Sequence, residues 1–210
     1  DEKLLQQTKL APFDAIILKG NVRNLRPRLF DLLAHRALDY FKDNERDITR
    51  PSYAFEISQN VVFANANSFM NEKFIIKDSA SLHQKALIIF QKLLAFHTND
   101  AKPDALIDAD LERINFAYQY GVMQNKDELY INALKHLNEK YASNPLSAQA
   151  GFLIAQHIYN KAIEANRSKD SSSNYSVKKA KEILDGLIKK YPTSEGGINA
   201  QNLLSQLVHP

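Results

Sequence analysis

The sequence has 210 residues, of which 44% are hydrophobic and 24% are charged, a composition typical of a globular protein with one large or two small domains. Its formal charge is +3, from 27 basic and 24 acidic side chains mixed along the chain, which argues against nucleic acid as a partner. The absence of cysteine excludes disulfides, thiolate metal sites and a cysteine nucleophile within these residues. No run of about 18 apolar residues is present, so we expect no membrane span.

The first 42 residues favour helix. Residues 2–10 are expected to form the end of a helix closed by Pro12, and residues 14–19 a short helical turn ended by Gly20. Residues 27–42 form the clearest N-terminal helix, because their apolar side chains recur at helical spacing. The predicted core side of that helix consists of Leu29, Leu32, Leu33, Arg36, Ala37, Tyr40 and Phe41.

The pattern changes between residues 50 and 77. The large apolar residues Tyr53, Phe55 and Ile57 occupy alternate positions, and an asparagine-rich middle opposes a long helix. We therefore expect an irregular, extended and aromatic-rich segment. Long loops often carry function, but the favoured interpretation is that the aromatic side chains close the end of a helical stack. These side chains are Tyr53, Phe55, Phe63, Phe69 and Phe74.

Residues 176–210 are predicted to form a helical hairpin. Pro192 ends its first helix, and Ser194 caps the start of its second helix. The pattern recurs upstream at constant offsets, of 94 residues between Ala86 and Ala180 and of 50 residues between Leu134 and Leu184. Because one pair of short helices cannot shield its own apolar stripe, repeated pairs must pack on one another.

The predicted fold is all-α: stacked antiparallel helical hairpins that resemble tetratricopeptide repeats or an α-solenoid, although spacings of 44 to 50 exceed the usual repeat. We expect one domain over residues 1–210, a fragment of a longer protein. Residues 1–77 would hold the N-terminal helices and the extended segment. The helical hairpins would lie at 78–165 and 176–210, with a polar linker at 166–175.

No motif in the sequence indicates a reaction. The histidines show no HxxxH or HExxH pair, no serine lies in a GxSxG context, and no glycine-rich phosphate loop is present. Asp108 and Glu112 share a helical face while Asp110 points away to form an ion pair with Arg113. His97 takes the place of Tyr191 in the later repeat, which favours packing or an interhelical hydrogen bond. We therefore expect no enzyme activity, no cofactor and no metal site.

Two groups of basic residues and one arginine are candidate binding elements. The lysines of residues 178–190 and the arginines at 23, 26 and 28 are interpreted as solvated structural charges, with phosphate binding as the alternative. Arg36 falls on the apolar side of its helix, where it would need a carboxylate such as Asp39 or Glu56. An enzyme would instead require a cleft in which histidines and carboxylates of shifted pKa converge.

Four stretches resemble a known family: LRPRLFDLLAHRALDYF, ITRPSYAFEI, KALIIFQKLLAFH and ALIDADLERINFAYQ. They are similar to the N-terminal helical region of large alpha-2-macroglobulin-like proteins of Gram-negative bacteria, over roughly residues 25–160. The resemblance implies an exported protein of the periplasm or cell envelope, often lipid-anchored, whose distant domains carry a protease bait. It supplies no catalytic residue here. Some such bacteria attach O-glycans at motifs similar to Asp78-Ser79-Ala80, which makes Ser79 a candidate acceptor.

The expected function is that of a non-enzymatic scaffold or docking domain in such an envelope protein. Its partners would be other domains of the same polypeptide or a protein or peptide, bound at a surface that includes Arg36, Tyr53 and Phe55. The alternative is a free-standing, tetratricopeptide-like periplasmic lipoprotein for envelope assembly or glycan uptake.

Overall fold

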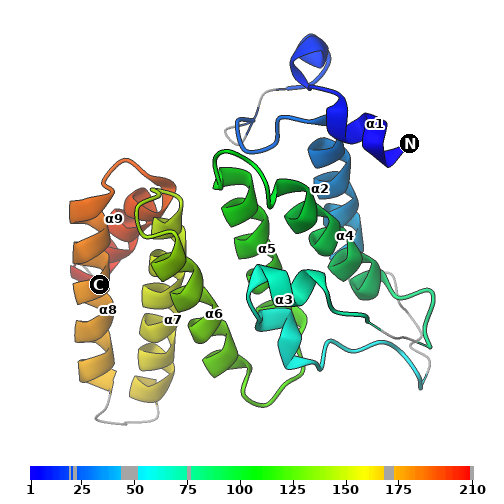
Figure 1. Ribbon diagram of the computed structural model, residues 1–210. Coiled ribbons are helices and arrows are strands. Elements are labelled where there is room, and N and C mark those ends of the chain that lie inside the picture. Colours follow the sequence, from blue (N-terminus) through cyan, green and yellow to red (C-terminus); the bar gives the residue numbers. More distant parts are fainter. Residues whose placement is uncertain (19, 21–22, 44–51, 75–76, 168–172, 209–210) are drawn as a thin grey trace. The chain divides into compact units, whose positions relative to one another are not determined.

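The computed structural model describes the chain except residues 19, 21–22, 44–51, 75–76, 168–172 and 209–210 (Figure 1). Every regular element in the described part is a helix, and only two isolated bridges pair extended backbone, Lys9 with Arg28 and Ile57 with Gly121. The predicted all-α class is confirmed. Internal contacts divide the chain into two compact units, Asp1–Lys126 and Asp127–Pro210. The assignment of all 210 residues to one domain stays a prediction.

Unit 1 is built around helix α5 (Asp104–Tyr120), which is buried along most of its length. Helix α4 (Leu82–His97) packs against α5, α2 (Leu29–Phe41) and the short helix α3 (Ala66–Met70). Helix α1 (Glu2–Gln7) packs on α2, and the short 3-10 helix η2 (Asn60–Phe63) lies against α5. A second 3-10 helix, η1 (Ala11–Phe13), precedes a run of turns rather than the helical turn expected at residues 14–19.

The start of α2 is fixed by its cap. The Arg28 N–H donates to the Asp31 carboxylate over 2.8 Å, which satisfies a donor that has no partner inside the helix. The helix therefore begins at Leu29, close to the predicted position.

The predicted core side of α2 was wrong. Leu33 and Tyr40 are 46% and 45% exposed, and Arg36 is exposed as well. The buried side instead carries Phe30, Asp31, Ala34, His35 and Leu38. Two polar residues can face inward because each finds a charged partner on a neighbouring helix, and this tertiary pairing outweighs the apolar stripe visible in the sequence.

The segment expected to be irregular, at residues 50–77, contains η2 and α3 joined by irregular backbone in its described part. Phe63 and Phe69 are buried, as the structural interpretation of the aromatic residues predicts, and Phe74 lies with its ring centroid 5.9 Å from that of Phe69. Tyr53 is 59% exposed and belongs to no core.

Unit 2 comprises α7 (Ser147–Arg167), α8 (Ser173–Lys190), α9 (Glu195–Val208) and all but the first residue of α6 (Lys126–Lys140). Helices α7, α8 and α9 pack pairwise. Tyr130 of α6 meets His157 of α7 with ring centroids 5.6 Å apart. The buried core of the last three helices is formed by Phe152, Ala155, Leu184, Ala200 and Leu203.

The 50-residue repeat is visible in unit 2. Leu134 and Leu184 are both fully buried, and the Tyr191 hydroxyl donates to the Ala142 carbonyl over 2.6 Å, so that the end of α8 is joined to the turn between α6 and α7. The predicted cap at Ser194 is confirmed, because its hydroxyl accepts the Gly197 N–H at 3.1 Å. The predicted linker at 166–175 is shortened by α7 and α8, and residues 168–172 lie outside the described part.

None of the described helices combines the length and the low polarity needed to cross a membrane.

The start of α9 touches α7 so closely that only glycine fits. A Cβ atom at Gly196 would lie 2.2 Å from the Ala148 carbonyl carbon. We expect Gly196→Ala to lower the free energy of unfolding by about 1–3 kcal/mol, because the two backbones must separate. Urea denaturation followed by circular dichroism measures this change.

Gly186→Ala is the matched control, since Gly186 lies exposed within α8 and no atom outside the adjoining helix backbone lies within 4 Å of the position that a Cβ would take there. It should raise the free energy of unfolding by roughly 0.5–1 kcal/mol through helix propensity. Equal effects of the two substitutions would refute the close contact at Gly196.

Candidate functional site

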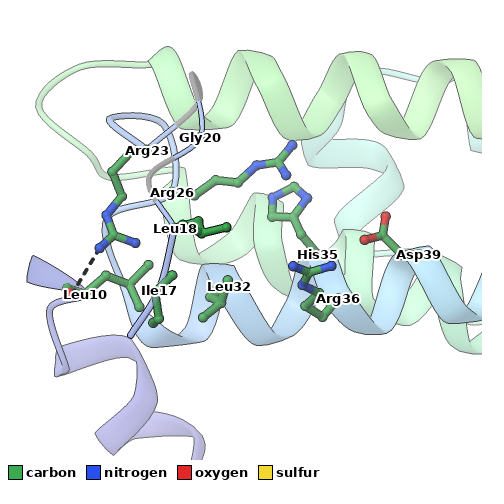
Figure 2. A pocket seen from close by; sticks show the side chains of 10 residues that line it. All are labelled: Leu10, Ile17, Leu18, Gly20, Arg23, Arg26, Leu32, His35, Arg36 and Asp39. Atoms are coloured by element: carbon green, nitrogen blue, oxygen red, sulfur yellow. Dashed lines mark hydrogen bonds between the residues drawn. The ribbon is translucent and has the colours of Figure 1, made fainter. Parts of the chain in front are cut away.

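A pocket of about 280 Å³ lies in unit 1 between α2 and the irregular chain that precedes it (Figure 2). Its apolar side is formed by leucine and isoleucine side chains of both segments. Figure 2 shows the basic side chains of Arg26, His35 and Arg36 near one another, with Asp39 beyond them. The described lining consists of Leu10, Ile17, Leu18, Gly20, Arg23, Arg26, Leu32, His35, Arg36 and Asp39.

Carboxylates of α5 hold two of the basic side chains of the pocket, Arg26 and His35, from behind. Arg26 bonds Asp108 through Nε and Nη2, at 3.4 and 3.2 Å, and its Nη2 lies 3.8 Å from Glu112. The Nδ1 atom of His35 lies 3.0 Å from Glu112 Oε2, and Lys42 Nζ lies 2.5 Å from the other carboxylate oxygen. Asp108 and Glu112 thus share a helical face, as predicted. In the sequence Arg26 stands out only as part of a basic cluster, because its acidic partners lie more than 80 residues away.

Glu112 is an ionised structural anion. Burial by itself would raise its pKa, but the contacts with His35 and Lys42 outweigh that effect and lower the pKa from 4.5 to about 2. A carboxylate with this pKa is too weak a base for proton transfer near neutral pH. The described pocket lining also contains no hydroxyl or amine that could act as a nucleophile beside His35.

A second buried polar cluster joins α2 to the end of α4. His97 Nε2 lies 3.1 Å from Asp31 of α2, and its Nδ1 lies 2.7 Å from Asp100. His97 and Asp31 are almost completely buried. Burial lowers the pKa of His97, but the hydrogen bonds and charges of the two aspartates outweigh it, so the pKa is raised above 6.5. Of the two roles predicted for His97, packing or an interhelical hydrogen bond, the structure shows the hydrogen bond.

A third cluster surrounds Arg113, which is 1% exposed. Its Nε donates to Asp110 over 2.8 Å, its Nη2 to the Ala64 carbonyl over 2.9 Å and its Nη1 to the Val62 carbonyl. The guanidinium also lies over the Phe69 ring, 4.6 Å from its centroid. The predicted ion pair with Asp110 is confirmed, but it lies in the core, whereas the i,i+3 spacing alone indicates a simple surface pair.

Arg36 does not occupy the buried position expected from its helical spacing. It is exposed on α2 and lines the pocket. Within the described part of the chain, neither Asp39 nor Glu56 lies within ion-pair distance of it, and Asp39 lies 3.9 Å from Lys42. Its guanidinium is therefore available to a ligand or partner.

The other predicted surface residues lie in the irregular segments. Tyr53 is exposed, whereas Phe55 is half-buried and its N–H donates to Asp78 over 3.3 Å. No contact among the described residues joins either aromatic residue to Arg36. Ser79 is exposed in a turn beside Asp78, whose carboxylate also accepts the Ala80 N–H at 3.2 Å.

Comparison with known proteins gives no identification: no protein family, curated protein or solved structure matches the chain. In the part of the chain that the structure describes, no group of three histidine, cysteine, aspartate or glutamate side chains is arranged to hold a metal ion. The resemblance to alpha-2-macroglobulin-like proteins stays a prediction.

His97 should make stability depend on pH near neutrality. Because folding raises its pKa, its protonated form stabilises the native state below pH 6.5, and this contribution is lost as pH rises through the folded-state pKa. We expect the free energy of unfolding to fall over this window in the wild type and to change less in His97→Gln. Urea denaturation at a series of pH values measures both slopes.

His136→Gln, which alters an exposed side chain of α6, is the control and should retain the wild-type slope. Parallel curves for wild type and His97→Gln would contradict the role given to His97.

Glu112 should give stability the opposite pH dependence to that of His97. Its lowered pKa stabilises the folded state above pH 4.5, and this contribution is lost as pH falls from 4.5 to about 2. Glu112→Gln should therefore lower the free energy of unfolding by about 1–3 kcal/mol at neutral pH, with the difference from wild type shrinking in acid. Chemical denaturation of both proteins at neutral and at acid pH measures this difference, and Glu139→Gln, which alters an exposed side chain of α6, is the control. A difference that stays constant in acid would count against the ion-pair network.

Proposed function

We propose that the chain is a non-enzymatic protein-interaction domain whose docking surface is the exposed side of α2. The observation that carries the proposal is a row of side chains on this helix. Leu33 and Tyr40 are nearly half exposed, and Arg36 lies between them at helical spacing. The opposite side of the same helix is buried, so the row faces away from the core of unit 1.

The row favours one kind of partner, an amphipathic helix that carries a carboxylate. Leu33 and Tyr40 offer apolar area that a partner helix can cover, as in helix-in-groove recognition. Arg36 forms no ion pair within the described chain, and its planar guanidinium is suited to bidentate binding of an aspartate or glutamate. Arginine and tyrosine are also the residue types that contribute most at interfaces.

Two of the anchors predicted from the sequence have unequal support. Tyr53 is exposed and can serve as a second contact. Phe55 is half-buried and its backbone is tied to Asp78, which makes it a weaker candidate.

The absence of enzyme activity is part of the proposal. It is supported by the low pKa of Glu112 and by the lack of a nucleophile in the described pocket lining, although a histidine and a carboxylate do meet there.

We further place the domain in a macroglobulin-like protein of the periplasm or cell envelope, where its partner would be another domain of the same polypeptide or a neighbouring protein. The support for this setting is the likeness of the sequence stretches at residues 25–160. Sequencing the full gene shows whether it also encodes β-rich macroglobulin domains, and this tests the proposed setting separately from the docking surface.

Site-specific photo-crosslinking tests the docking surface. A photoreactive residue is placed at Leu33 or Tyr40 of the full-length protein in its native cells, with the exposed Lys135 of unit 2 as the control position. We expect crosslinks from α2 to exceed those from position 135 at least about fivefold, and we expect mass spectrometry to find an acidic helical segment. Arg36→Gln should reduce the yield, because the charge contact is lost.

Equal crosslinking from α2 and from position 135 would reject the docking surface. Crosslinks to a second copy of this chain would replace the proposed partner with a homodimer, and crosslinks to a basic segment would contradict the role of Arg36. A parallel Tyr53→Ala variant shows whether Tyr53 belongs to the same interface.

A further inference from the structure

We propose that the pocket beside α2 binds a small organic acid, a single carboxylate attached to a compact aliphatic or aromatic group. The inference goes beyond the proposed function, because Leu33 and Tyr40 of the docking row do not line the pocket. Its first support is size. The cavity of about 280 Å³ lies just below the range of roughly 300–1,000 Å³ typical of drug-sized ligands, which suits a smaller molecule.

The lining offers many hydrogen-bond donors and few acceptors. Three guanidinium groups and one imidazole face a single carboxylate, that of Asp39. Arg26 uses Nε and Nη2 for Asp108, so its Nη1 is left for a ligand, and Arg36 has no ion-pair partner in the described chain. A surplus of donors in a concave site favours an anion.

Three of the four donor side chains, those of Arg23, Arg26 and His35, are held in place before any ligand arrives. Arg23 donates to the Leu10 carbonyl over 3.2 Å and is paired with Asp14. Arg26 is anchored on α5 by Asp108, and the His35 side chain, only 8% exposed, is held against Glu112. A ligand therefore meets three donor groups that are already ordered, and only the Arg36 side chain must be ordered on binding.

The charge balance favours a monoanion. The carboxylates of Asp14, Asp108 and Glu112 stand behind the basic lining and offset most of its charge. Arg36 is the cation without such a partner in the described chain, which suits one carboxylate better than a doubly charged phosphate.

The remaining lining is apolar. Leu10 is fully buried, Leu32 and Ile17 are half-buried, and Leu18 is 98% exposed. A ligand with an aliphatic or aromatic body would cover the exposed parts of Ile17, Leu18 and Leu32 from water while its carboxylate meets the guanidinium groups. A simple inorganic anion would leave that apolar area uncovered.

The test uses the full chain and defined probes: 3-methylbutanoate and phenylacetate, with their neutral amides and inorganic phosphate as comparators. We expect the acids to bind with Kd between about 10 μM and 1 mM, a range suited to ligands of this size. The amides and phosphate should bind at least about tenfold more weakly. Calorimetry gives the affinities, and methyl NMR shifts of Leu10, Ile17 and Leu32 locate the site.

Single variants test the pocket, and a double variant separates it from the docking row, with which the pocket shares Arg36. Arg36→Gln, an exposed change that keeps helix propensity, should weaken acid binding at least about tenfold. Leu32→Ala should weaken it severalfold through lost apolar contact, and Lys135→Gln should leave it unchanged. A Leu33→Ser, Tyr40→Ser double variant should retain acid binding even where it abolishes binding of the docking partner. Circular dichroism confirms that each variant is folded.

Several outcomes overturn the inference. Amides that bind as well as the acids would show that the charge is not recognised, and tighter binding of phosphate would assign a different anion. Acid binding that is insensitive to Arg36→Gln, or no binding at 10 mM probe, would remove the site. An acetylated glutamate-containing peptide that binds more tightly than either free acid would make the pocket a subsite of the docking surface.

Discussion

The burial of charged side chains on α5 is the constraint on which unit 1 depends. A buried guanidinium such as that of Arg113 costs several kcal/mol unless its donors are satisfied. Asp110 and the carbonyls of Val62 and Ala64 meet this need, so the irregular segment around η2 must close over α5. The packing of this aromatic-rich segment thus depends on one arginine, and the Phe69 ring covers a face of the Arg113 guanidinium.

The same constraint orients α2. Its buried side carries Asp31 and His35 because His97 and Glu112 stand opposite them on α4 and α5. This orientation leaves Leu33, Arg36 and Tyr40 on the outside and sets Arg36 beside the pocket. The proposed docking row and the proposed acid site are therefore both consequences of ion pairs in the interior, and a change to those pairs would disturb both surfaces.

Unit 2 is stabilised in a different way. Its last three helices share an apolar core, and α9 reaches α7 at Gly196, where a side chain would not fit. Tyr191 and His97, which occupy matching repeat positions, each bond an earlier element. The tyrosine does so through a neutral hydroxyl, whereas the histidine bonds the Asp31 carboxylate of α2 and also that of Asp100 just after its own helix. Matching repeat positions thus both hold a helix end to an earlier part of the chain, but the hydrogen-bonding groups that do so differ between the two units.

Helix periodicity, proline stops and caps were enough to predict the all-α class, the cap at Ser194 and the matching positions at Leu134 and Leu184, because these are local or repeated signals. The burial of Arg113, the inward side of α2 and the pocket could not be predicted in this way. Each depends on a charge partner far along the chain, as Arg26 depends on Asp108 and Asp31 on His97. Local pattern determined where the long helices lie, and long-range pairing of charges decided which side of α2 is buried and which is exposed.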